Sequence, residues 1–119
     1  MAQNEKHELL IKQLMVALSA TGVCRVWKQN TGKAYRDGRW ISFGIVGGGD
    51  ITGILLGGRR IEIECKTGGA KQHEEQRNFG EVIRKMGGIY IVARDVETVV
   101  KYIKNEGDKA LCNFNQSSQ

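Results

Sequence analysis

The chain has 119 residues, of which 40% are hydrophobic and 26% are charged, a length that suits one domain with its own core but not two. No apolar run approaches the length of about eighteen residues that a membrane-spanning helix needs, and the first residues lack the apolar core of a secretion signal. The formal net charge of +5 favours an anionic partner such as nucleic acid.

The cysteines indicate a reduced compartment. Cys24, Cys65 and Cys112 are odd in number and have no CxxC spacing, which predicts reduced, mostly buried thiols rather than a disulfide framework. Neither of the two histidines sits near a cysteine pair. We therefore expect a cytoplasmic protein without a structural zinc site.

The first half of the chain predicts one helix, two strands and the turns between them. Apolar residues recur at helical spacing up to Gly22, which ends the helix, and alternate with polar residues in the strands. The predicted elements are a helix over residues 5–21, strands over 23–27 and 40–45, turns at 30–32 and 37–38, and a glycine run at 47–49.

The second half predicts a hairpin, two helices and a strand. Asp95 is the expected N-cap of the last helix. The predicted elements are a hairpin of residues 50–56 and 60–66, a helix over 71–86, a strand over 89–93, a last helix after 95 and a frayed polar tail at 113–119. The order α-β-β-β-β-α-β-α predicts a single α/β domain over residues 1–119, with its core at about 5–105.

Residues 61–66, Ile-Glu-Ile-Glu-Cys-Lys, are the most informative in the chain. Side chains alternate along a strand, so Glu62, Glu64 and Lys66 would share one face and the apolar residues the other. Together with Asp50, this face outlines a metal-dependent site that cleaves phosphodiesters. The alternative is a surface strand with a solvated salt-bridge face, which is common in antiparallel sheets.

The turn at Gly57-Gly58 decides whether Asp50 can meet Glu64, because residues paired across a ladder share a face. A two-residue loop would pair Asp50 with Cys65 and direct its side chain away from Glu64. A three-residue loop, Gly57-Gly58-Arg59, would pair Asp50 with Lys66 and bring it to the polar face. We therefore predict a loop of odd length or a bulge in the strand.

If Asp50 and Glu64 converge, they offer hard oxygen ligands to Mg²⁺ or Mn²⁺, with the main-chain carbonyl of Cys65 as a third. Such an ion lowers the pKa of a bound water and neutralises charge in the transition state. Lys66 can orient that water or stabilise the developing charge.

Polar residues also continue the apolar stripes of both long helices. Glu8 lies three residues before Ile11, and Gln72 and Gln76 precede Phe79 in steps of four and three. Polar groups on a buried stripe need partners, although the same positions can mark where a stripe emerges into water. We predict that these helix ends face the strand carboxylates.

Asp50 followed by Glu64-Cys65-Lys66 resembles the PD-(D/E)xK nuclease signature, with Gly49 where the family's label has proline. The chain is more closely similar to the VRR-NUC (virus-type replication-repair nuclease) branch, over residues 8–103. The segments that carry this resemblance are Glu8, Val26-Trp27, Asn30-Thr31-Gly32, residues 47–53, Gln76-Arg77-Asn78-Phe79 and residues 87–93.

The resemblance implies a single PD-(D/E)xK-like domain, with a central mixed sheet flanked by helices and the core order α-β-β-β-α-β. Asp50, Glu64 and Lys66 match the family's catalytic acidic pair and lysine, Glu8 its metal-binding helix glutamate and Gln76 its site glutamine. It further implies a Mg²⁺- or Mn²⁺-dependent endodeoxyribonuclease of DNA repair that cuts Holliday junctions or other branched DNA. Such proteins act as homodimers in bacteria or phage-infected cells.

Other functions stay open from the residues alone. One is a sequence-specific restriction-type nuclease, and another is a non-catalytic nucleic-acid-binding module, which the intact Asp50, Glu64 and Lys66 set disfavours. A third is a basic scaffold that binds another protein. Trp27 is predicted to fill the core rather than to stack on bases.

Overall fold

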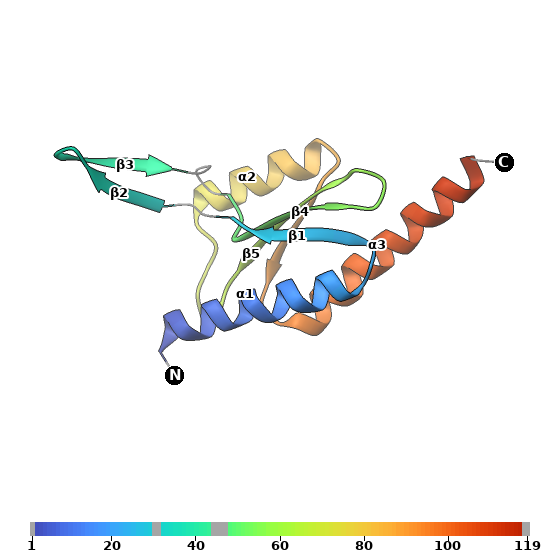
Figure 1. Cartoon of the computed structure of the whole chain (residues 1–119), viewed down its shortest axis with the longest axis horizontal. Coiled ribbons are helices and arrows are strands. Elements are labelled where there is room, and N and C mark those ends of the chain that lie inside the picture. The colour runs from blue at the N-terminus through green and yellow to red at the C-terminus, as the bar shows by residue number, and fades with distance from the viewer. Residues whose placement is uncertain (1, 30–31, 44–47, 118–119) are drawn as a thin grey trace.

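A four-stranded mixed sheet flanked by helices forms the centre of the computed structural model (Figure 1). The structure describes residues 2–29, 32–43 and 48–117. The helices are α1 (Gln3–Ala20), α2 (Glu74–Lys85) and α3 (Val96–Ser117), and the strands are β1 (Cys24–Lys28), β2 (Gly32–Arg36), β3 (Arg39–Phe43), β4 (Ile51–Leu55), β5 (Arg60–Cys65) and β6 (Ile89–Ala93).

The sheet has the strand order β1-β4-β5-β6. The pairs β1–β4 and β4–β5 are antiparallel, whereas β5 and β6 are parallel. A parallel pair needs a crossover connection, which α2 supplies. The predicted α/β domain with a mixed sheet flanked by helices is therefore confirmed.

One face of the sheet packs against α1 and α3 and forms the apolar core. On β5, the side chains of Ile61, Ile63 and Cys65 point into this core and are almost fully buried, as the alternation of the strand predicted. Burying a side chain of this size stabilises a fold by about 1.5–3 kcal/mol. The other core residues include Leu10, Ile11, Leu14, Leu18, Ile51, Leu55, Ile89, Ala93, Val99 and Ile103.

The strands β2 and β3 form a separate two-stranded hairpin that projects from the main sheet (Figure 1). Asp37 and Gly38 make its turn with φ angles of 53° and 77°, which suits a two-residue hairpin loop. Near the tip, the exposed rings of Tyr35 and Trp40 meet edge to face, 5.4 Å apart. The sequence predicted the turn and β3 but not β2, and residues 44–45 of the predicted strand lie outside the described residues.

The β4–β5 hairpin has a loop of odd length, as predicted. Ile54 pairs with Arg60, and the Leu55 N–H donates to the Arg59 carbonyl at 2.8 Å, so the loop is Leu56-Gly57-Gly58. It begins one residue earlier than the predicted Gly57-Gly58-Arg59. Continued by one pair, this register places Asp50 opposite Glu64 rather than Lys66.

The last helix begins where predicted, because Asp95 Oδ2 accepts the Thr98 N–H at 2.8 Å. It continues to Ser117, so the prediction that the tail frays is wrong for residues 113–117, where helical hydrogen bonding extends beyond the apolar stripe. Residues 118–119 lie outside the described part. Within the described residues, no helix combines the length and apolar character needed to cross a membrane.

Trp27 is half exposed, at 50%, so its predicted place in the core is wrong. It lies on β1, one of the two edge strands of the four-stranded sheet, on the face opposite to the core. The helix on that face, α2, packs on β5 and β6. The residue pattern of β1 cannot predict the exposure of Trp27, because that exposure depends on which strands α2 covers.

Candidate active site

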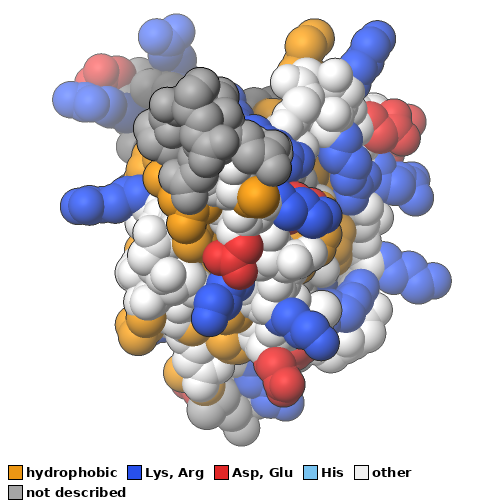
Figure 2. All heavy atoms as spheres, turned by 90° about the vertical axis from the view of Figure 1, so that its right-hand side faces the viewer, with side chains coloured by type: hydrophobic (Ala, Val, Ile, Leu, Met, Phe, Trp, Pro, Cys, Tyr) orange, Lys and Arg blue, Asp and Glu red, His pale blue; other side chains and the backbone are white. Residues whose placement is uncertain are grey.

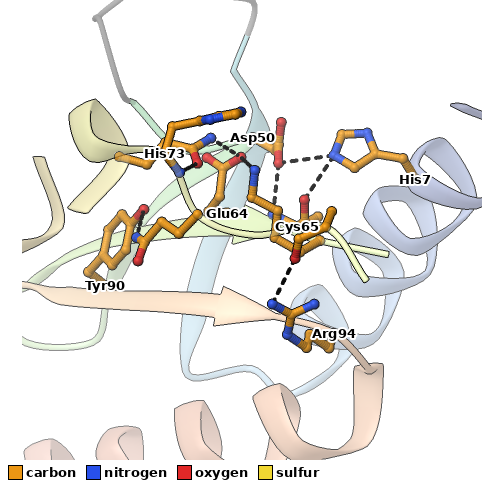
Figure 3. Close-up of polar contacts among 11 residues, drawn as sticks. His7, Asp50, Glu64, Cys65, His73, Tyr90 and Arg94 are labelled. Carbon is orange, nitrogen blue, oxygen red and sulfur yellow. Dashed lines mark hydrogen bonds and ion pairs between the residues drawn. The ribbon is translucent and has the colours of Figure 1, made fainter. Parts of the chain in front are cut away.

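Asp50 and Glu64 lie beside each other at the end of the β4–β5 ladder. The last pair of that ladder is Ile51 with Ile63, and the next residue on each side, Asp50 or Glu64, points to the polar face. Asp50 Oδ2 accepts the Cys65 N–H at 2.7 Å, which ties its carboxylate to β5. Figure 3 shows the two carboxylates on neighbouring segments above the sheet.

Two side chains contact the Glu64 carboxylate, one from α2 and one from the residue that follows β5. Gln76 on α2 donates from Nε2 to Glu64 Oε1 at 2.7 Å, and Lys66 Nζ lies 3.7 Å from the same oxygen. The side chains of Lys66 and Glu64 are only 10% and 6% exposed. The structure thus brings Asp50, Glu64, Lys66 and Gln76 together in one partly enclosed cluster.

The pKa of Glu64 is raised to about 8, first by burial and then by the negative charge of Asp50, against the opposing effect of Lys66. Burial disfavours the ionised carboxyl, and a neighbouring carboxylate adds to that cost. With both groups ionised, the pair would hold more negative charge than its surroundings neutralise, so Glu64 keeps its proton more readily than a free carboxyl. A cation placed between the two groups would relieve this imbalance.

His7 on α1 also reaches this cluster and was missed in the sequence. Its Nε2 lies 3.0 Å from the Cys65 carbonyl oxygen and 3.3 Å from Asp50 Oδ2 (Figure 3). Both of these oxygens accept, so Nε2 carries the proton. The signal was present, because His7 precedes the buried Leu14 by seven residues and so lies on the buried stripe of α1.

Glu8 points elsewhere. Its carboxylate accepts a hydrogen bond from Lys28 Nζ at 2.9 Å, and both side chains are about half exposed, at 47%. This contact is the main reason that the pKa of Glu8 is lowered. One residue along a helix turns the side chain by about 100°, which separates Glu8 from the direction of His7.

The described residues contain no group of three or more His, Cys, Asp and Glu side chains arranged to hold a metal ion. If Glu8 is left aside, the predicted ligands are the two carboxylates of Asp50 and Glu64 and the main-chain carbonyl of Cys65. This set contains only two such side chains, so it would not form a group of three. The metal-binding role of Glu8 stays a prediction.

The two glutamines that were predicted to face inward both have partners. Gln76 Oε1 accepts the His73 N–H at 2.8 Å, which completes a capping box at the start of α2. Gln72 precedes the helix and donates to the Tyr90 hydroxyl at 2.9 Å. The first turn of α2 is therefore fixed to the sheet on both sides of His73.

Glu62 and Glu64 are buried, with 0% and 5% exposure, so the alternative of a solvated salt-bridge face is wrong. Glu62 is held by Thr52 and Arg60, at 2.8 and 2.7 Å from its Oε1. Its Oε2 lies near Gly49, where a Cβ would come within 3.0 Å. Burial also raises the pKa of Cys65 to about 12, so its thiol stays protonated and unreactive.

Comparison of the sequence with protein-family models and with curated proteins gave no match.

Proposed function

We propose that the protein is a divalent-metal-dependent endonuclease that hydrolyses phosphodiester bonds in branched DNA. The observation that carries this proposal is the cluster of Asp50, Glu64 and Lys66, two carboxylates and an ammonium at one end of the central strands β4 and β5. The chain order α1, β1, β4, β5, α2, β6 supports a PD-(D/E)xK-like core with the β2–β3 hairpin as an insertion.

Asp50, Glu64 and the main-chain carbonyl of Cys65 would hold the cation. Oxygen ligands of this kind suit Mg²⁺ and Mn²⁺, and the raised pKa of Glu64 supports the fit because a cation would offset the repulsion from Asp50. When bound, such an ion activates a water and neutralises charge on the phosphate. The Cys65 carbonyl has a second lone pair besides the one that His7 engages.

The surrounding side chains would position these groups. Gln76 fixes the orientation of the Glu64 carboxylate through its 2.7 Å hydrogen bond. Lys66 is held beside Glu64 with little exposure, where its ammonium would add positive charge next to a scissile phosphate. A ligand role for Glu8 would require its ion pair with Lys28 to open.

Positive charge over the surface supports DNA as the substrate. The net charge is +5, and Lys and Arg side chains are spread over the face shown in Figure 2, among a few Asp and Glu. A homodimer would supply one active site for each of two symmetric cuts in a four-way junction.

A cleavage assay tests the proposal with four-way junction, flap and linear duplex DNA, each with Mg²⁺, Mn²⁺ or EDTA. Lys66→Ala should lower the rate by about 10²-fold or more, as expected on loss of a group that stabilises transition-state charge. Lys101→Ala is the matched control, because Lys101 is an exposed lysine on α3. It should leave the rate within about twofold of the wild type if only the site lysine matters.

Cleavage that persists in EDTA or in Lys66→Ala would refute the assigned site. Metal-independent binding without any cleavage would favour the nucleic-acid-binding module instead. Cleavage confined to one duplex sequence would favour the restriction-type nuclease. Binding should weaken steeply with salt, because released counterions contribute much of the affinity for DNA.

A further inference from the structure

The polar face of the sheet extends beyond the acidic pair as two further rows of side chains. Residues two apart on a strand share a face, so these rows lie on the same side as Asp50 and Glu64. Taken from β1 through β4 to β5, the rows are Trp27–Thr52–Glu62 and Arg25–Ile54–Arg60.

This part of the face forms a shallow groove. Trp27 and Ile54 are 50% and 46% exposed, and the side chain of Arg60 is 48% exposed. Together with Thr52 they line a groove of about 580 Å³. The groove lies next to the candidate site, since Gln29, which follows Trp27 by two residues, donates its N–H to the Asp50 carbonyl at 2.9 Å.

A buried carboxylate holds Arg60 in this groove. Glu62 is fully buried, and its Oε1 accepts from Arg60 Nε at 2.9 Å and Nη2 at 2.7 Å. Two hydrogen bonds to one buried oxygen hold the guanidinium in a defined position. A fixed and half-exposed guanidinium suits contact with a phosphate.

We propose that this groove binds an unpaired nucleotide of the DNA substrate, with its base stacked on Trp27 and a neighbouring phosphate on Arg60. Successive rows on one sheet face are about 7 Å apart, which places Trp27 one nucleotide's reach from the acidic pair. An exposed aromatic ring beside cationic side chains is the combination that single-stranded DNA sites use. Beyond its pair with Glu62, the Arg60 side chain stays 48% exposed, and this exposed positive charge complements a phosphate, which an apolar protein patch lacks.

The inference rests on the proposed function and narrows its substrate to branched DNA with unpaired nucleotides at the branch. Binding in the groove itself needs no metal ion. The groove and the nuclease activity can therefore be tested separately.

Trp27 fluorescence provides the test, because the chain has two tryptophans and Trp40→Phe leaves Trp27 alone. Titration of this variant with single-stranded oligothymidylate in EDTA should quench the emission. In anisotropy titrations with labelled oligothymidylate, Trp27→Ala should weaken binding roughly 5- to 150-fold, the range expected for loss of one stacked base. Trp27→Phe should keep most of the affinity, and Val16→Ala, an exposed position on α1, should change nothing.

Absence of quenching would refute nucleotide binding in the groove. The same conclusion would follow if Trp27→Ala weakened the binding of blunt duplex and of oligothymidylate equally. Folding of each variant is checked by circular dichroism, and retained affinity in Trp27→Phe separates stacking from a loss of structure. Quenching without metal-dependent cleavage of any DNA would support nucleotide binding in the groove and refute the proposed nuclease activity. If Trp27→Ala does not change the rate at which flap DNA is cleaved, the nucleotide-binding role of the groove is refuted and the nuclease activity is not.

Discussion

Gln76 on α2 donates a 2.7 Å hydrogen bond to Glu64 on β5 and, through its other amide atom, accepts the N–H of His73 at 2.8 Å. One side chain therefore closes the first turn of the helix and orients a carboxylate of the candidate site. Changes at this position affect helix stability and the site together, and different substitutions separate the two effects.

Gln76→Ala should lower the free energy of unfolding by about 1–3 kcal/mol, because it leaves partly buried hydrogen-bonding groups without partners. Gln76→Glu should keep the cap but add a third carboxylate beside Glu64, so its loss should fall mainly on metal binding and cleavage. Urea unfolding at pH 7 measures the first effect, and metal titration the second. Asn78→Ala, exposed on the same helix, is the control, and an equal loss of stability there would contradict this role of Gln76.

The pKa of Glu64, raised from 4.5 to about 8, makes stability depend on pH. Between these values the folded state keeps a proton that the unfolded state releases, so this stabilising contribution is full below about pH 4.5 and is lost as pH rises through about 8. The free energy of unfolding should therefore fall across this window. Glu64→Gln should flatten the decline, whereas Glu81→Gln, at an exposed position on α2, should not.

Metal binding should strengthen as pH rises towards 8, because the cation must displace the proton on Glu64. Mn²⁺ at a hundred times its dissociation constant stabilises a protein by about 2.7 kcal/mol. At one fixed Mn²⁺ concentration, the rise in melting temperature should be larger at pH 8 than at pH 6. It should vanish in Asp50→Asn, and an equal shift at both pH values would argue against Glu64 as a ligand.

Asp50 also has a structural role that its two simplest substitutions separate. Its carboxylate accepts the Cys65 N–H at 2.7 Å, so Asp50→Ala should cost about 1–3 kcal/mol by leaving that buried donor without a partner. Asp50→Asn keeps an acceptor oxygen and should cost less, while removing the charge that raises the pKa of Glu64. Urea unfolding of both variants at pH 7 checks this order, and equal costs for the two would show that the charge, not the hydrogen bond to Cys65, determines the loss.

Gly80 fixes how closely α2 packs on β6. A Cβ at this position would lie 2.6 Å from the Tyr90 ring, and Tyr90 accepts the hydrogen bond from Gln72. Gly80→Ala should destabilise the fold by about 1–3 kcal/mol through overpacking, even though alanine favours helices by about 1 kcal/mol. Gly69→Ala has open space around it and should be nearly neutral in the same thermal or urea unfolding measurement.

The elements that the sequence predicted well are those in which one local pattern and the core agree. Alternation in β5 was sufficient because Ile61 and Ile63 lie on one face of the strand, in the same core as apolar residues of α1 and α3. Strand β2 was missed because Gly32–Arg36 has no such apolar alternation and pairs only with β3. The β4–β5 loop was predicted to be odd in length, but consecutive glycines do not specify where it begins.

The candidate site was predictable on the strands and less so on α1. Asp50, Glu64 and Lys66 follow from strand alternation and hairpin register, which are local. His7 and Glu8 are adjacent on one helix turn, and only the packing of α1 against β5 decides which of them meets Asp50. The partly buried Met15 had drawn the predicted stripe towards Glu8.

At Cys65 the candidate site uses the peptide backbone while the core uses the side chain. Its N–H binds Asp50, its carbonyl binds His7, and its thiol is 1% exposed among apolar residues. A replacement side chain at this position therefore has to match the thiol only in volume and apolar character. Alanine or valine should leave both backbone contacts in place, whereas a shift of the backbone here would disturb Asp50 and His7 together.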